Sequence, residues 1–245
     1  MGEEFIRSKM VLGTAAMERL AGCRVAVFGL GGVGGCAAEA LVRSGIGALD
    51  LIDHDRVSLS NLNRQIIATH STVGMRKVDA AAMRFLDINP NLRLHLHPTF
   101  LSSETADTFD FAAYDYIVDA IDTVTAKICL ILRAKAADTP IICSMGTGNK
   151  LDPSQLTITD LSKTSMDPLA RVMRRELRRR GVTHLKVLCS TEEPTLRHRP
   201  QPESAADSSA DQPRKAVPGS SSFVPPAAGF LIASAVVRDL VKDLL

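Results

Sequence analysis

Residues 25–53 read VAVFGLGGVGGCAAEALVRSGIGALDLID, and this stretch decides the fold of the chain. The apolar run 25–28 predicts a buried strand, the glycines after it predict a tight turn, and the alanine-rich segment up to Ser44 predicts a helix. A second apolar strand then ends at Asp53. A strand, a turn, a helix and a second strand in this order are typical of a βαβ unit, whose strands lie parallel in one sheet.

The glycines of this turn indicate a nucleotide site. They stand at the G-x-G-x-x-G spacing, where a side chain would keep a phosphate away from the N–H groups at the helix N-terminus. Asp53 follows about 20 residues later, where a carboxylate can bind ribose hydroxyls. The spacing fits NAD, FAD and some ATP sites alike, so it leaves the nucleotide open. The candidate residues of the turn are Gly29, Gly31, Gly32 and Gly34.

Composition narrows the class of protein. A chain of 245 residues can bury a full core, and we expect one large α/β domain rather than two small ones. The net charge is only +2, so a nucleic-acid surface must be a local patch. The five cysteines are scattered without a C-x-x-C pair, which argues against structural zinc and favours a reducing compartment. No secretory signal is expected, and the apolar run 227–237 is too short to span a bilayer, so we expect a cytoplasmic protein without membrane contact.

Apolar runs and helical patterns alternate along the rest of the chain. This rhythm predicts a Rossmann-like, mostly parallel sheet with helices on both faces, and the alternation over 156–159 predicts an antiparallel extension. The predicted strands are 92–96, 116–119, 140–144 and 184–189, and the predicted helices are 14–20, 74–86, 102–109 and 124–137. Within a single domain 1–245 we expect a nucleotide-binding core over about 23–160, a basic helix over about 168–180, a flexible loop over about 192–222 and a last helix over about 227–244.

Polar residues follow the carboxyl ends of two predicted strands, where ligands bind in open α/β sheets. Lys77 lies in the first turn of a helix, where a cation opposes the helix dipole. A polyanion between Lys77 and Arg64 would offset that cost, although a solvated lysine fits the sequence equally well. Asp122 could either cap the following helix or hold Mg²⁺ between phosphates. The residues after the first of these strands that join the candidate site are Asp55, Asn61, Arg64 and Gln65.

The predicted helix after Asp167 carries an arginine stripe. Asp167, Pro168 and Gly181 mark its ends as an N-cap, a first-turn proline and a terminating glycine. Arginines three and four residues apart occupy one side of a helix and could grip successive phosphates of a nucleic acid, although a solvated basic face is the simpler alternative. The candidate nucleic-acid-binding residues are Arg171, Arg174, Arg175 and Arg178.

Up to about residue 160 the chain resembles the ubiquitin-activating-enzyme-like adenylating superfamily, of the ThiF and MoeB type. The motif residues are Gly29, Gly31 and Gly34, then Asp53, Asp55, Asn61, Arg64, Gln65 and Lys77, and finally Asp119 to Asp122. The resemblance implies that the glycine turn holds ATP and that Asp53 binds its ribose. It also implies that Asn61, Arg64 and Lys77 engage the triphosphate and the acyl-adenylate, and that Asp122 positions Mg²⁺. An N-terminal arginine, here Arg7, is expected to reach the site from the second subunit of a homodimer.

Within that superfamily the chain is similar to the tRNA threonylcarbamoyladenosine dehydratases. The likeness extends through residues 160–169, the basic helix, residues 185–192 and the return segment 219–230. It implies a tRNA substrate whose threonylcarbamoyladenosine carboxylate, next to the anticodon, is adenylated with ATP. Attack from within the same side chain then closes a cyclic ester, releasing AMP. The resemblance leaves open a requirement for K⁺ or Na⁺ and a cysteine desulfurase or sulfur acceptor as partner.

Three alternatives remain at the level of the sequence. An adenylyltransferase for a ubiquitin-like sulfur carrier would use the same ATP residues, but such enzymes usually carry paired C-x-x-C motifs. An NAD-dependent oxidoreductase does not explain Arg64, Lys77 and Arg7, and a non-catalytic tRNA-binding relative does not need the nucleotide residues.

Some relatives carry a cysteine in the late loop, and residues 192–226 contain none. Cys189 lies in an apolar strand, so we predict no enzyme thioester, and trapping one there would refute this.

Overall fold

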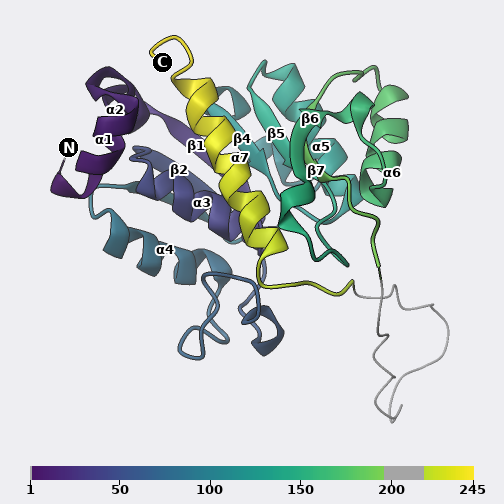
Figure 1. Ribbon diagram of the computed structural model, residues 1–245, viewed down its shortest axis with the longest axis horizontal. Helices are drawn as coiled ribbons and strands as arrows, with labels where there is room; N and C mark the ends of the chain where they lie inside the picture. Colours follow the sequence, from purple (N-terminus) through teal and green to yellow (C-terminus); the bar gives the residue numbers. More distant parts are fainter. Residues whose placement is uncertain (1, 196–217) are drawn as a thin grey trace.

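The computed structural model describes residues 2–195 and 218–245 (Figure 1). These residues contain one seven-stranded sheet with the order β3-β2-β1-β4-β5-β7-β6. Its strands are β1 (Arg24–Phe28), β2 (Ala48–Ile52), β3 (Arg93–His97), β4 (Tyr116–Asp119), β5 (Ile141–Ser144), β6 (Leu156–Asp160) and β7 (Lys186–Ser190). Every pairing is parallel except that of β6 with β7. The predicted parallel sheet and its antiparallel extension are therefore confirmed.

The strand order reverses direction between β1 and β4, which pair side by side at the centre of the sheet. From β1 the chain builds outward through β2 to the edge strand β3, and from β4 it builds the other way to β6. Parallel strands end at the same edge of a sheet, so the loops after β1 and β4 diverge there. A reversal of this kind leaves a crevice at the carboxyl ends of the strands.

Helices cover both faces of the sheet. They are α1 (Ile6–Leu12), α2 (Thr14–Gly22), α3 (Gly34–Arg43), α4 (Lys77–Ile88), α5 (Val124–Ala136), α6 (Pro168–Arg178) and α7 (Val224–Leu240). In Figure 1, α7 runs over α3 on the near side of the sheet, and α5 and α6 lie toward the other end. Alternate β1 side chains point to opposite faces, so Val25 and Val27 join the core under α3 and α7, whereas Ala26 and Phe28 join the core with α5 and α6.

Three predicted helices differ from the structure, and one of them is α4, which begins at Lys77 rather than at residue 74. Residues 102–109 form a turn and a short 3₁₀ helix at Ala106–Thr108, because Thr105 Oγ1 accepts from Ser102 N at 2.9 Å and donates to Phe100 O at 2.7 Å. Such side-chain bonds compete with a helix. The last helix begins at Val224, before the predicted residue 227, because proline lacks an N–H and fits a first helical turn. It ends at Leu240.

Most of the predicted loop 192–222 lies outside the described residues. Its described parts, 192–195 and 218–222, contain neither helix nor strand. In the portions of the chain that the structure describes, no helix is both long and apolar enough to cross a membrane.

A buried ion pair fixes the centre of the sheet. Lys127 Nζ of α5 lies 2.9 Å from Asp119 Oδ2 at the end of β4, and both side chains are 0% exposed. The same ammonium donates to the carbonyl oxygen of Ile121 at 3.1 Å and to that of Ser144 at 2.9 Å. Because Ile121 follows β4 and Ser144 ends β5, one side chain holds the carboxyl ends of two neighbouring strands.

We predict that Lys127→Met lowers the free energy of unfolding by about 3–5 kcal/mol, because it leaves the Asp119 carboxylate buried without its cation. Urea unfolding followed by circular dichroism measures this loss. The double variant Lys127→Met/Asp119→Leu removes both charges and should lose clearly less than the single variant. A single variant as stable as the wild type would contradict the structural role of the pair.

Candidate functional site

A cleft of about 680 Å³ opens at the carboxyl ends of β1, β2, β4 and β5. The glycine turn forms one wall, and the loop after β4 and the loop after β5 form another. This is the crevice expected where the strand order reverses. Of the residues proposed from the sequence, those that line it are Gly29, Gly31, Gly32, Asp53, Asp55, Asn61, Arg64, Gln65, Lys77 and Asp122.

Close backbone packing and Asp53 shape the glycine turn. Gly29 has a φ of +90°, and a Cβ on Gly34 would lie 1.8 Å from the Gly29 carbonyl oxygen, so neither position tolerates a side chain. Asp53 Oδ2 accepts from Leu30 N at 2.7 Å, and its Oδ1 accepts from Asp55 N at 2.8 Å. Gly34 thus lies beneath the turn and does not line the cleft, and Asp53 ties the turn to β2. Each carboxylate oxygen keeps a further lone pair for a ribose hydroxyl.

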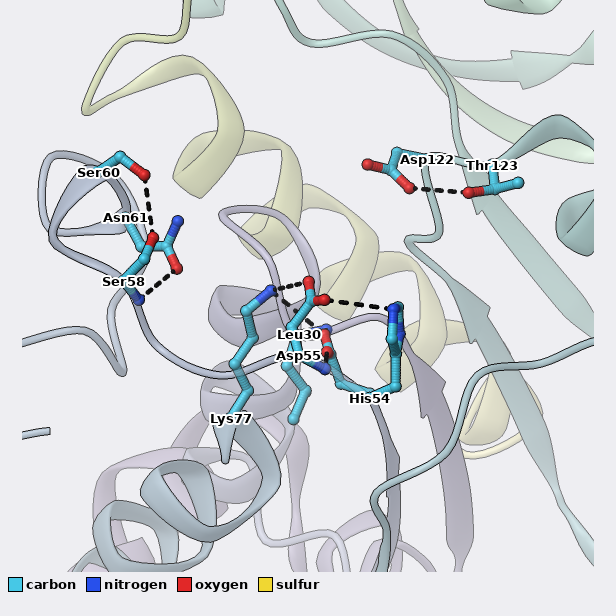
Figure 2. Close-up of polar contacts among 10 residues, drawn as sticks. Leu30, His54, Asp55, Ser58, Ser60, Asn61, Lys77, Asp122 and Thr123 are labelled. Atoms are coloured by element: carbon cyan, nitrogen blue, oxygen red, sulfur yellow. Dashed lines mark hydrogen bonds and ion pairs between the residues drawn. The ribbon is translucent and has the colours of Figure 1, made fainter. Parts of the chain in front are cut away.

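Lys77 is buried and ion-paired, so the alternative of a solvated lysine is wrong. Its Nζ lies 2.7 Å from Asp55 Oδ2 and 3.7 Å from Asp53 Oδ2, which offsets the unfavourable position at the start of α4. Burial raises the pKa of Asp55, but the hydrogen bond and charge of Lys77, together with the charge of His54, outweigh it and hold that pKa below its usual value. Figure 2 shows Lys77 directed at Asp55, with Asn61 and Asp122 on separate segments.

The segment after β2 contributes Asn61, Arg64 and Gln65. Asn61 Oδ1 accepts from Ser58 N at 3.1 Å, which closes a short 3₁₀ helix. Arg64 binds Ser60 O at 2.9 Å and Asn63 Oδ1 at 2.8 Å, and both bonds use Nη1. The rest of this guanidinium can therefore serve an anion in the cleft.

Gln65 supplies a separate sign of a missing ligand. It is 6% exposed and lines the cleft, and its Oε1 has no hydrogen-bond partner among the described residues. A buried acceptor without a donor costs free energy, so this atom fits a site that is completed by a polar ligand.

Asp122 lies across the cleft from Lys77 (Figure 2) and does not cap α5. The N-cap of that helix is Thr123, which makes no capping bond from its side chain, and Asp122 Oδ1 accepts, within the part of the chain that the structure describes, only from Thr123 Oγ1 at 3.3 Å. The side chain is exposed, so its carboxylate oxygens are available to a hard cation. The donor set therefore fits Mg²⁺ carried by phosphates, and the capping alternative is wrong.

Arg7 lies away from the cleft of its own chain. It is exposed on α1 and does not line the cavity. The structure therefore brings together the nucleotide candidates except Arg7 and the buried Gly34.

The second half of the cleft contains residues that sequence reasoning missed. Asp167, known only as a helix cap, accepts from Ala170 N at 3.0 Å and also from Gly146 N at 2.9 Å, so it joins α6 to the loop after β5. Lys150 is 2% exposed and donates to Ser190 O at 3.3 Å. Burial lowers the pKa of Lys150 despite the nearby charge of Asp167. The sequence feature that could have indicated this half of the cleft is the run 145–150, which directly follows a buried strand.

Cys189 has the surroundings of an inert thiol. It is 2% exposed, and its pKa is raised by burial and by the charge of Asp167, although Lys150 acts in the opposite direction. A thiol that resists ionisation is a poor nucleophile. The absence of an enzyme thioester stays a prediction.

The arginines of α6 line a shared surface hollow, but they are not equivalent. Arg174 is part-buried, and its Nη1 donates to Thr164 Oγ1 at 2.6 Å and to Thr164 O at 2.8 Å, which fastens the helix to the preceding segment. Arg175 is exposed and pairs with Glu176. The residues lining the hollow are Arg171, Arg174, Arg175, Arg178 and Arg179.

Fold and cleft together define a Rossmann-like protein whose glycine turn and cationic side chains line one cleft at the carboxyl ends of the strands. A model of the ThiF family matches residues 6–241, and the chain belongs to this family. It is 41% identical over 246 residues to the tRNA threonylcarbamoyladenosine dehydratase of Bacillus subtilis, covering 100% of this chain and 97% of that protein.

Solved structures of the Escherichia coli tRNA N6-threonylcarbamoyladenosine dehydratase are also similar. Its complex with ATP gives a TM-score of 0.86 at 31% identity, covering 98% of this chain and 95% of that one. Its complex with AMP gives 0.86 at 32% identity with the same coverage.

Proposed function

We propose that this protein is an ATP-dependent tRNA threonylcarbamoyladenosine dehydratase acting as one adenylating domain. The observation that carries the proposal is the placement of Arg64, Lys77 and Asp122 around the glycine turn, in a chain that matches a dehydratase over its whole length. The similar Escherichia coli dehydratase has solved structures in complex with ATP and with AMP, and the residues of this cleft suit the same nucleotides.

The proposed chemistry follows from the low reactivity of a carboxylate toward nucleophiles. A carboxylate is a poor electrophile at neutral pH, so one of its oxygens first attacks the α-phosphorus of ATP and pyrophosphate leaves. An oxygen of the same modified side chain then attacks the activated carbonyl carbon, and AMP leaves. A proton is lost as the ring closes, and the net loss is one water. Ring closure within one substrate is helped by proximity and needs no enzyme nucleophile.

The cleft residues act on the charge that develops on phosphate. In this proposal Arg64 and Lys77, which line the cleft, stabilise the leaving pyrophosphate, and Asp53 holds the ribose that leaves as part of AMP. Asp122 would hold Mg²⁺, which neutralises phosphate charge when bound. A requirement for K⁺ or Na⁺, sulfur-relay partners and a cytoplasmic location stay predictions from the sequence.

The structure gives no observation that favours the alternative function, an adenylyltransferase for a ubiquitin-like sulfur carrier. Its specific feature is the paired C-x-x-C motif, which the chain lacks, and the full-length likeness is to a dehydratase. A small protein ending in Gly-Gly that stimulates ATP–pyrophosphate exchange would reverse this preference.

We predict that the wild-type protein, given ATP, Mg²⁺ and tRNA bearing threonylcarbamoyladenosine, forms AMP and a nucleoside lighter by one water. Mass spectrometry after mild digestion measures the nucleoside. Lys77→Ala should lower the rate by about 100-fold or more, because a preorganised cation is lost from the site. Lys135→Ala, an exposed lysine on α5, is the matched control. An unchanged nucleoside with the wild-type protein would refute the dehydratase proposal.

The α6 hollow is the proposed site for tRNA phosphates. Replacing Arg171, Arg175 and Arg178 together by Ala should weaken tRNA binding and make the dependence of log K on log salt shallower, by about 0.7–0.9 per lost phosphate contact. Arg174 stays in place because it supports the helix. Arg93→Ala, on the far edge strand β3, is the control. Fluorescence anisotropy over a salt series measures both quantities, and an unchanged slope would leave α6 a solvated basic face.

A homodimer is proposed because Arg7 lies outside its own cleft, on a helix whose apolar side chains face solvent. Ile6 is 53% exposed, Met10 77% and Val11 81%, which is typical of a contact surface. If Arg7 serves the partner's site, mixed dimers of Arg7→Ala and Lys77→Ala contain one intact site. We predict that refolding the two inactive variants together restores partial activity. No restoration, with a dimer verified by light scattering, would place Arg7 outside catalysis.

A further inference from the structure

Asn149 has an unusual backbone conformation inside the cleft. It follows β5, lines the cavity and has a φ of 59°, in the left-handed region that residues with a side chain rarely adopt. Asparagine tolerates this conformation better than most residues. Strained positions of this kind often occur at functional sites, so the contacts of Asn149 indicate what the conformation serves.

Three hydrogen bonds use both the backbone and the side chain of Asn149. Its N–H donates to Gly219 O at 2.8 Å, and its carbonyl accepts from Thr195 N at 2.9 Å. Its side-chain Oδ1 accepts from Gly219 N at 2.7 Å. One residue therefore fastens Thr195 and Gly219, which lie on either side of the stretch 196–217 that the structure does not describe, to the loop after β5.

The same contacts continue to the nucleotide half of the cleft. Asn63 Nδ2 donates to Ser220 O at 2.9 Å, and Asn63 Oδ1 accepts from Arg64 at 2.8 Å. A continuous path of hydrogen bonds and covalent bonds thus runs from Arg64 through Asn63, Ser220 and Gly219 to Asn149. Pro194, Pro218, Gly219 and Ser220 line the cleft along this path, and we call these four residues the acceptor wall.

The acceptor wall packs tightly against the loop that carries Asn149. A Cβ added to Gly148 would lie 2.9 Å from Pro218 Cβ and 3.4 Å from Gly219 O. The wall therefore has little freedom to move toward the loop after β5, and the three bonds of Asn149 keep it from moving away.

We propose that Asn149 is a positioning residue that sets, through the acceptor wall, where the substrate carboxylate stands relative to Arg64 and the α-phosphate. The inference rests on the proposed function and deepens it. Adenylation needs the attacking oxygen at about 3–3.5 Å from phosphorus and in line with the leaving group. Within the described chain, Asn149 makes no hydrogen bond to the glycine turn, Asp53 or Lys77, the residues proposed to hold ATP. Loss of the hydrogen bond from Gly219 N to Asn149 Oδ1 therefore slows turnover and leaves ATP binding intact.

Asn149→Gly tests this directly, because glycine keeps the left-handed backbone and removes only the Oδ1 bond to Gly219. We expect kcat with modified tRNA to fall about tenfold, with ATP affinity within about twofold of wild type and an unchanged Tm. Asn149→Asp keeps an acceptor for Gly219 N and should recover part of the lost kcat. Gly148→Ala, which pushes on Pro218, should give the same separation of kcat from ATP affinity.

The outcomes separate this inference from the proposed function. A wild-type protein that forms no dehydrated nucleoside overturns both. An active wild type with an unaffected Asn149→Gly variant overturns the positioning role alone. A variant that loses kcat, ATP affinity and Tm together has a merely structural defect, and that result also overturns the positioning role.

Discussion

The ion pair between Lys127 and Asp119 is the interaction on which the rest of the cleft depends. It lies at the point where the strand order reverses, and its ammonium binds the carbonyl of Ile121 just after β4 and that of Ser144 at the end of β5. Asp122 follows one of these carbonyls, and the loop bearing Asn149 follows the other. A shift of the Lys127 ammonium would therefore move both Asp122, the proposed cation ligand, and the loop that carries Asn149. The Lys127 ammonium has three oxygen atoms around it, and this pairing of a charge that is shielded from solvent keeps the geometry rigid.

The cleft balances its own charge before any ligand enters. Lys77 is paired with two aspartates, and Lys150 lies close to the charges of Asp167 and Glu192 without a salt bridge to either within the described chain. Arg64 of the lining donates to Ser60 O and Asn63 Oδ1 and has no salt bridge to a carboxylate among the described residues. A triphosphate entering here competes with carboxylates for the ammonium of Lys77, so its affinity reflects an exchange of partners rather than a simple attraction.

Local pattern was enough to predict β1, the glycine turn, α3 and β2, because each depends on residues adjacent in sequence. The carboxyl-end rule for parallel strands then placed Asp53 and Arg64 in one cleft, and Lys77 joined them through its place at the start of a helix and the family resemblance. The burial of Lys77, the partners of Lys127 and the bonds of Asn149 were not predictable. Each joins segments far apart in the chain, and no periodicity records which side chain meets which backbone group. The predicted start of α7 at residue 227 was wrong because prolines fit the end of a loop as well as the first turn of a helix.

The two edge strands of the sheet differ, and the difference affects how readily copies of the protein aggregate through strand pairing. At one edge the short antiparallel β6 covers β7. At the other, β3 leaves its outer backbone groups unpaired within the described chain, and Arg93 and His95 are exposed along it. Charged and polar side chains on a short edge strand hinder the addition of a strand from another molecule. β3 is therefore an open edge that resists edge-to-edge aggregation.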